Sequence, residues 1–270
     1  MTAAPLYVQS SPEAEAAGAV AAVVASLPVS FAPATGRPDV VAVAGHAAWT
    51  ERAAGAVRNG ARGVVVANPV VEDPARLAEA AAEHRASVVL DQQWAGNPAI
   101  ADSRDSARKV ITEALADAVL VDSVAYSAPG NDPRGLLTDH LAAALQCGLE
   151  LDGLKVVQHG PSGYTLVGRL PNGAPAALHG ITTASVPATA TISILTSMGR
   201  ADITLPDASA AWPAEVRVVT TAGAALLPTL YESAHRHSWT RLRESLGSGR
   251  PAADLERFTL LNALVNQLAL

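Results

Sequence analysis

The chain of 270 residues is long enough to bury a sizeable core, and its 49% hydrophobic and 16% charged residues are typical of a globular protein. Its formal net charge of −6 argues against binding to nucleic acid or to an anionic membrane, since both require a basic surface. A single cysteine, Cys147, excludes an internal disulfide bond and favours a reducing, cytoplasmic location.

The first half of the chain alternates between predicted strands and helices. Leu6–Gln9 is predicted as a short strand, and Pro12–Leu27 as one Ala-rich helix that Ser11 caps. Apolar runs predict further strands, and capping and turn residues mark the helices between them. The strands are Val29–Phe31, Asp39–Ala44, Gly63–Ala67 and Ser87–Asp91, and the helices are Thr50–Asn59 and Asp73–His84. This rhythm predicts a parallel sheet with helices on both faces.

The pattern changes in the second half. A long strand is predicted at Ala118–Ser127 and a helix at Gly135–Cys147. Alternating segments between Leu154 and Leu205, separated by turn residues, predict an antiparallel meander, and helices at Trp239–Leu246 and Ala253–Leu268 close the chain. We therefore predict an α/β chain with a Rossmann-like parallel-sheet domain at residues 1–115. An α+β domain with an open antiparallel sheet follows at residues 116–270.

Several phrases in this layout resemble the Gfo/Idh/MocA family of NAD(P)-dependent oxidoreductases. Gly60 and Pro69 match family positions in the stretch NGARGVVVANPVV, and WAGNP at Trp94–Pro98 resembles the segment that follows the next strand. RGLLTDHLAAALQC resembles the family's helix that carries an Asp and a His. The resemblance covers residues 39–265. It implies a two-domain oxidoreductase, an NAD(P) cofactor, and a second sheet that often forms the subunit interface.

Two departures from the family pattern concern the cofactor and the chemistry. The family's glycine-rich turn would bring a backbone close to a diphosphate, but this chain has Gln9–Glu13 (QSSPE) there, without glycine. Asn68 stands where the family's Glu-Lys-Pro motif has a lysine, and an amide cannot carry a proton. These departures predict no cofactor-binding residues and no cofactor, with NAD(P) kept as the alternative.

The remaining candidates for chemistry are a few polar and aromatic side chains. Asp139 and His140 are candidate acid–base residues by the resemblance, and a structural or surface role for His140 is the competing interpretation. His235 and His237 lack a third ligand nearby in sequence, so no metal site is expected. Candidate pocket residues, each of which could instead be a capping, loop or packing residue, are His46, Trp49, Asn68, Trp94 and Asn97.

Three functions remain open, and the sequence does not settle whether the chain is an enzyme. The first is a homologue of these oxidoreductases that has lost NAD(P) hydride chemistry. It would serve as a partner subunit through the antiparallel sheet, in a homo-oligomer or in a hetero-oligomer with an active homologue. Alternatively, its pocket would be repurposed. The second is an NAD(P)-dependent dehydrogenase acting on a sugar or cyclic polyol. The third is a non-redox enzyme with a histidine general base.

Overall fold

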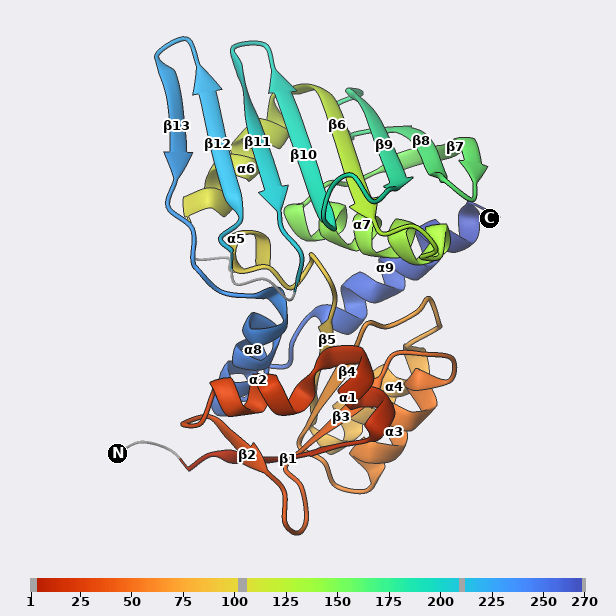
Figure 1. Cartoon of the computed structure of the whole chain (residues 1–270), viewed down its shortest axis with the longest axis vertical. Helices are drawn as coiled ribbons and strands as arrows, with labels where there is room; N and C mark the ends of the chain where they lie inside the picture. The colour runs from red at the N-terminus through yellow and green to blue at the C-terminus, as the bar shows by residue number, and fades with distance from the viewer. Residues whose placement is uncertain (1–3, 102–105, 209–211, 269–270) are drawn as a thin grey trace. The chain divides into compact units, whose positions relative to one another are not determined.

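The computed structural model describes residues 4–101, 106–208 and 212–268, and the chain divides into two compact units (Figure 1). The first unit contains Met1–Gly96 and Ala234–Asn262, and the second contains Asn97–Ser233 and Ala263–Leu270. The predicted boundary at residues 115 and 116 is therefore displaced. The chain also returns to the first unit, because Trp239 and Leu242 pack into its hydrophobic core.

Sheet A of the first unit consists of five parallel strands in the order β2-β1-β3-β4-β5. The apolar runs of β4 and β5 are buried along their whole length, as expected for strands that are covered on both faces. The strands are β1 (Leu6–Ser10), β2 (Phe31–Pro33), β3 (Val40–Ala44), β4 (Gly63–Ala67) and β5 (Ser87–Asp91).

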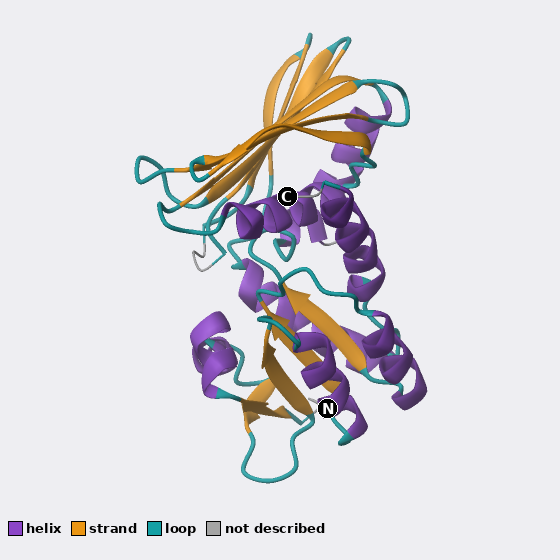
Figure 2. Cartoon of the chain, turned by 90° about the vertical axis from the view of Figure 1, so that its right-hand side faces the viewer, coloured by secondary structure: helices purple, strands orange, loops and turns teal. Residues whose placement is uncertain are grey.

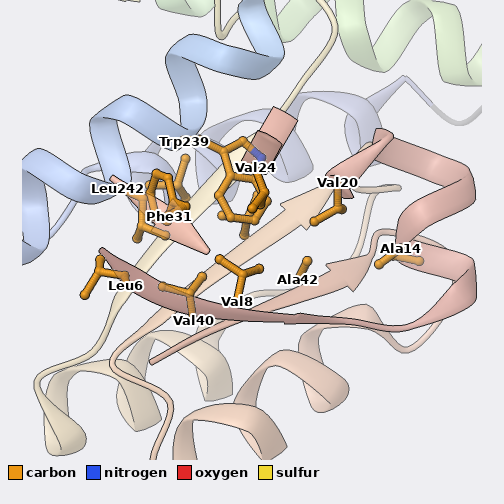
Figure 3. Close-up of a cluster of buried hydrophobic side chains, with 13 residues drawn as sticks. Leu6, Val8, Ala14, Val20, Val24, Phe31, Val40, Ala42, Trp239 and Leu242 are labelled. Carbon is orange, nitrogen blue, oxygen red and sulfur yellow. The ribbon is translucent and has the colours of Figure 1, made fainter. Parts of the chain in front are cut away.

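One face of sheet A carries a cluster of buried side chains. Leu6, Val8 and Val40 of the sheet point toward Trp239 of α8 (Figure 3). Trp239 also meets Phe31 edge to face, with ring centroids 5.2 Å apart. The helices of this unit are α1 (Pro12–Gly18), α2 (Val20–Ser26), α3 (Trp49–Arg58), α4 (Ala75–His84) and α8 (Ala234–Ser248). Helix α9 (Asp254–Gln267) belongs to this unit as far as Asn262.

The single helix predicted at Pro12–Leu27 is broken into α1 and α2. Ala19 adopts a left-handed conformation with φ of 44°, and Glu15 accepts hydrogen bonds from the N–H groups of Ala19 and Ala21. Gly18 lies so close to Ala67 that an added Cβ would come within 2.8 Å of the Ala67 Cβ. This contact with the end of β4 fixes α1 at the carboxyl edge of the sheet.

The connection from β2 to β3 contains no helix. Residues 34–39 lead directly from one strand to the next, and the sheet face opposite α2 is exposed along β1. Tyr7 and Gln9 of β1 are consequently exposed, whereas Leu6 and Val8 on the other face are buried.

Sheet B of the second unit has eight strands in the order β13-β12-β11-β10-β6-β9-β8-β7 (Figure 1). Figure 2 shows helices against one face of this sheet. All its pairs are antiparallel except β6 with β9, which is parallel. The strands are β6 (Ala118–Ser127), β7 (Asp152–Gly160), β8 (Gly163–Arg169), β9 (Pro175–Thr182), β10 (Thr189–Thr196), β11 (Gly199–Leu205), β12 (Glu215–Thr220) and β13 (Gly223–Leu227). Strands β12 and β13 were not predicted.

Helices α6 and α7 pack on sheet B. The cross-strand register places Ile192, Ser123, Leu178 and Leu166 in one row, and all four are buried. The row defines the buried face of the sheet. The helices of this unit are α5 (Pro98–Ala101), α6 (Ser106–Ala116) and α7 (Pro133–Cys147), of which only α7 was predicted.

Candidate functional site

The carboxyl edge of sheet A is the place where an open parallel sheet binds ligands. Three helices, α1, α3 and α4, begin at this edge. Their N-terminal amides would ordinarily be the donors for an anion such as phosphate. The side chains next to these amides therefore decide what the edge can bind.

The backbone N–H groups that an anion could bind in the first turn of α1 are occupied or absent. Ser11 Oγ accepts from the Ala14 amide at 3.2 Å, the Ser11 carbonyl accepts from the Glu15 amide, and Pro12 has no N–H. Glu13 adds a carboxylate, and hydrogen bonds from the Ser11 side chain and from its own backbone lower its pKa. This turn repels an anion rather than binding it.

The starts of α3 and α4 are closed in the same way. Glu72 accepts from the amides of Ala48 and Thr50 at 3.0 and 3.1 Å, and Asp73 accepts from the Ala75 amide at 3.0 Å. All three N-termini at this edge are thus capped by the chain's own acidic or hydroxyl side chains.

A cleft of about 610 Å³ opens between the first turn of α1 and the loop after β3. The terminal nitrogens of Arg52 donate to the carbonyls of Ala44, His46 and Ala47 at 2.7–2.9 Å, so this side chain shapes the loop. The cleft is lined by Gln9, Ser10, Ser11, Glu13, Pro38, Val41, Ala42, Val43, Ala44, His46, Arg52, Ala56, Asn59 and Ala61.

His46 and Asn68 both lie at the predicted edge but are not in one pocket. His46 is exposed and lines the cleft. Asn68, at φ 51°, donates its side-chain amide to the Ala17 carbonyl at 2.8 Å and does not line the cleft. Its loop lies directly against Gly45, where a Cβ would overlap the Asn68 backbone.

Trp49, Trp94 and Asn97 are packing or capping residues. Trp49 is fully buried, donates its indole N–H to the Val70 carbonyl at 2.8 Å and meets Phe258 edge to face. Asn97 belongs to the second unit and accepts from the Ala99 amide at the start of α5. Trp94 is also fully buried, and its indole Nε1 has no hydrogen-bond partner. None of these three side chains lines the cleft beside α1.

His140 lies in the second unit, inside a hydrogen-bonded chain on the buried face of sheet B. Ser123 Oγ donates to the Thr191 carbonyl at 2.8 Å and lies 2.6 Å from His140 Nε2, so Nε2 is the protonated nitrogen. Nδ1 then accepts from the Tyr164 hydroxyl at 2.9 Å. Burial lowers the pKa of His140 to about 3.

This geometry gives His140 a structural role instead of the predicted acid–base role. Both of its ring nitrogens are used, and a neutral imidazole without solvent contact exchanges no proton with a ligand. Asp139 is half-buried on the same helix, and its charge adds to burial in raising the pKa of Tyr164. Cys147, at the end of α7, is buried, and burial raises its pKa to about 12.

A pair that the sequence analysis did not predict lies at the end of β5. Asp91 is 1% exposed, and its Oδ2 lies 2.9 Å from Nδ1 of His235, a residue of α8. Asp91 Oδ1, Gln92 Nε2 and Trp94 Nε1 are buried without a hydrogen-bond partner. Unsatisfied buried donors and acceptors in three residues of this short segment indicate a place where a ligand or water completes the hydrogen bonding.

In the described part of the chain, no group of three His, Cys, Asp or Glu side chains is arranged to hold a metal ion. Among the same residues, no helix is long and apolar enough to span a bilayer.

No known protein family matches the sequence, and no curated protein matches it either. Solved structures do match the fold. A 3-ketoreductase from Actinomadura kijaniata, in complex with NADP and TDP-benzene, has a TM-score of 0.69 at 18% identity, with 98% of this chain and 97% of that chain covered. A UDP-N-acetylglucosamine 3-dehydrogenase from Acidithiobacillus ferrooxidans has a TM-score of 0.68 at 12% identity and the same coverage. A dehydrogenase from Clostridium difficile has a TM-score of 0.61 at 9% identity, with 97% and 98% covered.

The chain has the Gfo/Idh/MocA fold. The predicted two-domain architecture, with a parallel sheet first and a largely antiparallel sheet second, is thereby confirmed. The expectation that no nucleotide cofactor is involved is wrong, because a solved structure with this fold contains NADP.

A dinucleotide fits the Gfo/Idh/MocA fold of this chain only in part. Side chains of this chain already occupy four amides at the N-termini of α1, α3 and α4, those of Ala14, Ala48, Thr50 and Ala75. The cleft beside α1 has room and polar side chains for its uncharged portions. For this reason we derive no hydride-transfer step from the geometry.

Proposed function

We propose that the chain is an oxidoreductase that binds a nicotinamide nucleotide at the carboxyl edge of sheet A and acts on a sugar or cyclic polyol. The observation that carries this proposal is the likeness of fold over 98% of the chain to a 3-ketoreductase that holds NADP. When bound, the nicotinamide would supply the hydride donor or acceptor. The unsatisfied buried atoms after β5 support a ligand at this edge.

Asp91 and His235 are the residues we assign to proton handling. A buried carboxylate beside an imidazole fixes the tautomer of the ring and stabilises its protonated form. The pair lies 2.9 Å apart, and the His235 side chain is 16% exposed, so the ring is within reach of solvent. Oxidation of a sugar hydroxyl releases a proton and reduction of a keto sugar consumes one, so this pair would accept the proton in the first direction and donate it in the second.

The proposal is tested by absorbance at 340 nm with NADH or NADPH and a panel of sugars and keto sugars. Turnover is expected for the native chain, with a large loss in Asp91→Asn and His235→Gln. His84→Gln, an exposed histidine at the end of α4, is the matched control and should retain activity. Failure of the native chain to bind either nucleotide would overturn the proposal.

A second candidate is a nucleotide-binding chain that transfers no hydride and acts as a partner subunit. Asn68 favours this candidate, because its side-chain amide donates to the Ala17 carbonyl and cannot transfer a proton to or from a substrate. Exposed apolar side chains on sheet B, including Val157, Val167 and Leu226, support assembly with a second copy or an active homologue. Native mass spectrometry would detect such an assembly, and nucleotide binding without turnover would favour this candidate.

A further inference from the structure

The cleft between the first turn of α1 and the loop after β3 lies in a part of the fold that is shortened. The six residues 34–39 between β2 and β3 leave one face of β1 exposed, and the cleft extends from Ser10 and His46 to Pro38 and Ala61. Its volume of about 610 Å³ lies within the usual range for small-molecule pockets.

We propose that this cleft binds a nucleoside. The Glu13 carboxylate would accept hydrogen bonds from the vicinal diol of the sugar, and the base would lie on the apolar floor. Phosphate would make no contribution to binding. The inference rests on the proposed function, in which the nucleoside is one part of the nicotinamide nucleotide. It also explains how a nucleotide could bind without a glycine-rich turn.

The first argument is the absence of phosphate donors in the described residues around the cleft. Ser11 and Pro12 leave the α1 turn without an available amide, and Glu72 occupies the amides at the start of α3. Both terminal nitrogens of Arg52 already donate to carbonyls. A phosphate here would face the carboxylate of Glu13.

The second argument is the presence of a carboxylate suited to a diol. Dinucleotide folds use an acidic side chain at the end of the second strand to accept from ribose hydroxyls. Here β2 is followed by Ala34, Thr35 and Gly36, and Arg37 packs over Gly60 beyond the end of α3. Glu13 lines the cleft instead, is fully exposed and has a lowered pKa, so it is an ionised acceptor with two oxygens.

The third argument is the composition of the rest of the cleft. Val41, Val43 and Ala56 provide an apolar floor for a flat ring, and Ser10 and Gln9 provide neutral polar groups at the rim. An apolar surface with a few polar groups matches an uncharged heterocycle joined to a sugar better than it matches a free polyanion.

Competition binding tests this inference with the full chain. Bound NADH is followed by its fluorescence while adenosine, nicotinamide riboside or inorganic pyrophosphate is added. We expect one of the nucleosides to displace NADH, pyrophosphate to have no effect, and the affinity for NADH to change less than about twofold between low and physiological salt. Glu13→Gln should weaken nucleoside binding about tenfold, and Glu79→Gln, an exposed carboxylate on α4 outside the cleft, should not.

The outcomes separate this inference from the proposed function. Displacement by pyrophosphate, or a steep loss of NADH affinity with salt, would overturn the nucleoside inference and leave the proposed function standing. Nucleoside binding without NADH binding, measured by direct calorimetric titration with adenosine, would support the inference and overturn the proposed function. Unchanged nucleoside affinity in a folded Glu13→Gln variant, checked by its thermal unfolding, would overturn the role of Glu13.

Discussion

Ser123 Oγ on β6 lies 2.6 Å from Nε2 of His140 on α7, and both side chains are fully buried. The contact joins the middle of sheet B to the helix that covers it. Because burial lowers the pKa of His140 to about 3, the native state holds this ring neutral across the physiological range.

The stability of the chain should therefore fall in acid through His140. Its folded pKa is depressed below the ordinary value of 6.5, so the unfolded chain takes up a proton in this window and the native chain does not. Stability from this residue is complete above pH 6.5 and is lost at about 1.4 kcal/mol per pH unit as the pH falls toward 3. Urea unfolding of the native chain and of His140→Phe, as a function of pH, would measure it.

The variant should be less stable at pH 7 by about 1–3 kcal/mol, because the Ser123 and Tyr164 partners remain buried. Its stability should depend less steeply on pH. An equal slope in both proteins would contradict the structural role, and His46→Phe, an exposed position, is the control.

A second prediction concerns Asp254, at the start of α9. Burial disfavours its charge, but Arg241 and Arg257 donate to it and the Leu90 amide donates at 2.9 Å, so its pKa is lowered. Asp254→Ala leaves Arg241 buried without its partner and should cost about 3–5 kcal/mol in the free energy of unfolding. The contribution of Asp254 is present above its ordinary pKa and is lost as the pH falls below it.

Glu256→Ala, two residues further along α9 and exposed, should change the free energy of unfolding by less than about 0.5 kcal/mol. Chemical denaturation of both variants at pH 7 distinguishes the two positions. Similar stabilities for the two variants would contradict the account of Asp254.

A third prediction concerns close packing at the carboxyl edge. Gly45→Ala would place a Cβ against the backbone of Asn68 and should destabilise the chain by about 1–3 kcal/mol. Gly55→Ala in α3 meets nothing within 4 Å and should stabilise it by about 0.5–1 kcal/mol. Thermal unfolding of the two variants should therefore shift in opposite directions, and shifts in the same direction would show that the loops after β3 and β4 do not pack as described.

The parallel sheet was predictable because its central strands are apolar on both faces, so short runs such as Gly63–Ala67 identify them. The break at Ala19 was not predictable, because alanine favours a helix. It accompanies the contact of Gly18 with Ala67, which is far away in sequence. Strands β12 and β13 lie at the edge of sheet B, where β13 is largely exposed and gives no alternating pattern.

The candidate site was less predictable than the fold. His46 was placed at the correct edge by the rule for open parallel sheets, and it lines the cleft. Asp91 and His235 are 144 residues apart, and only the packing of α8 against β5 brings them together. The buried end of the SVVLD strand was the one available signal, because a carboxylate in a buried position requires a partner.

Calorimetric titration of the full chain with NADPH and with NADH tests the central claim most directly. The account predicts saturable binding of one nucleotide per chain with a dissociation constant below about 1 mM, the range of working cofactor sites. Absence of binding by either nucleotide to the folded protein at that concentration would contradict it.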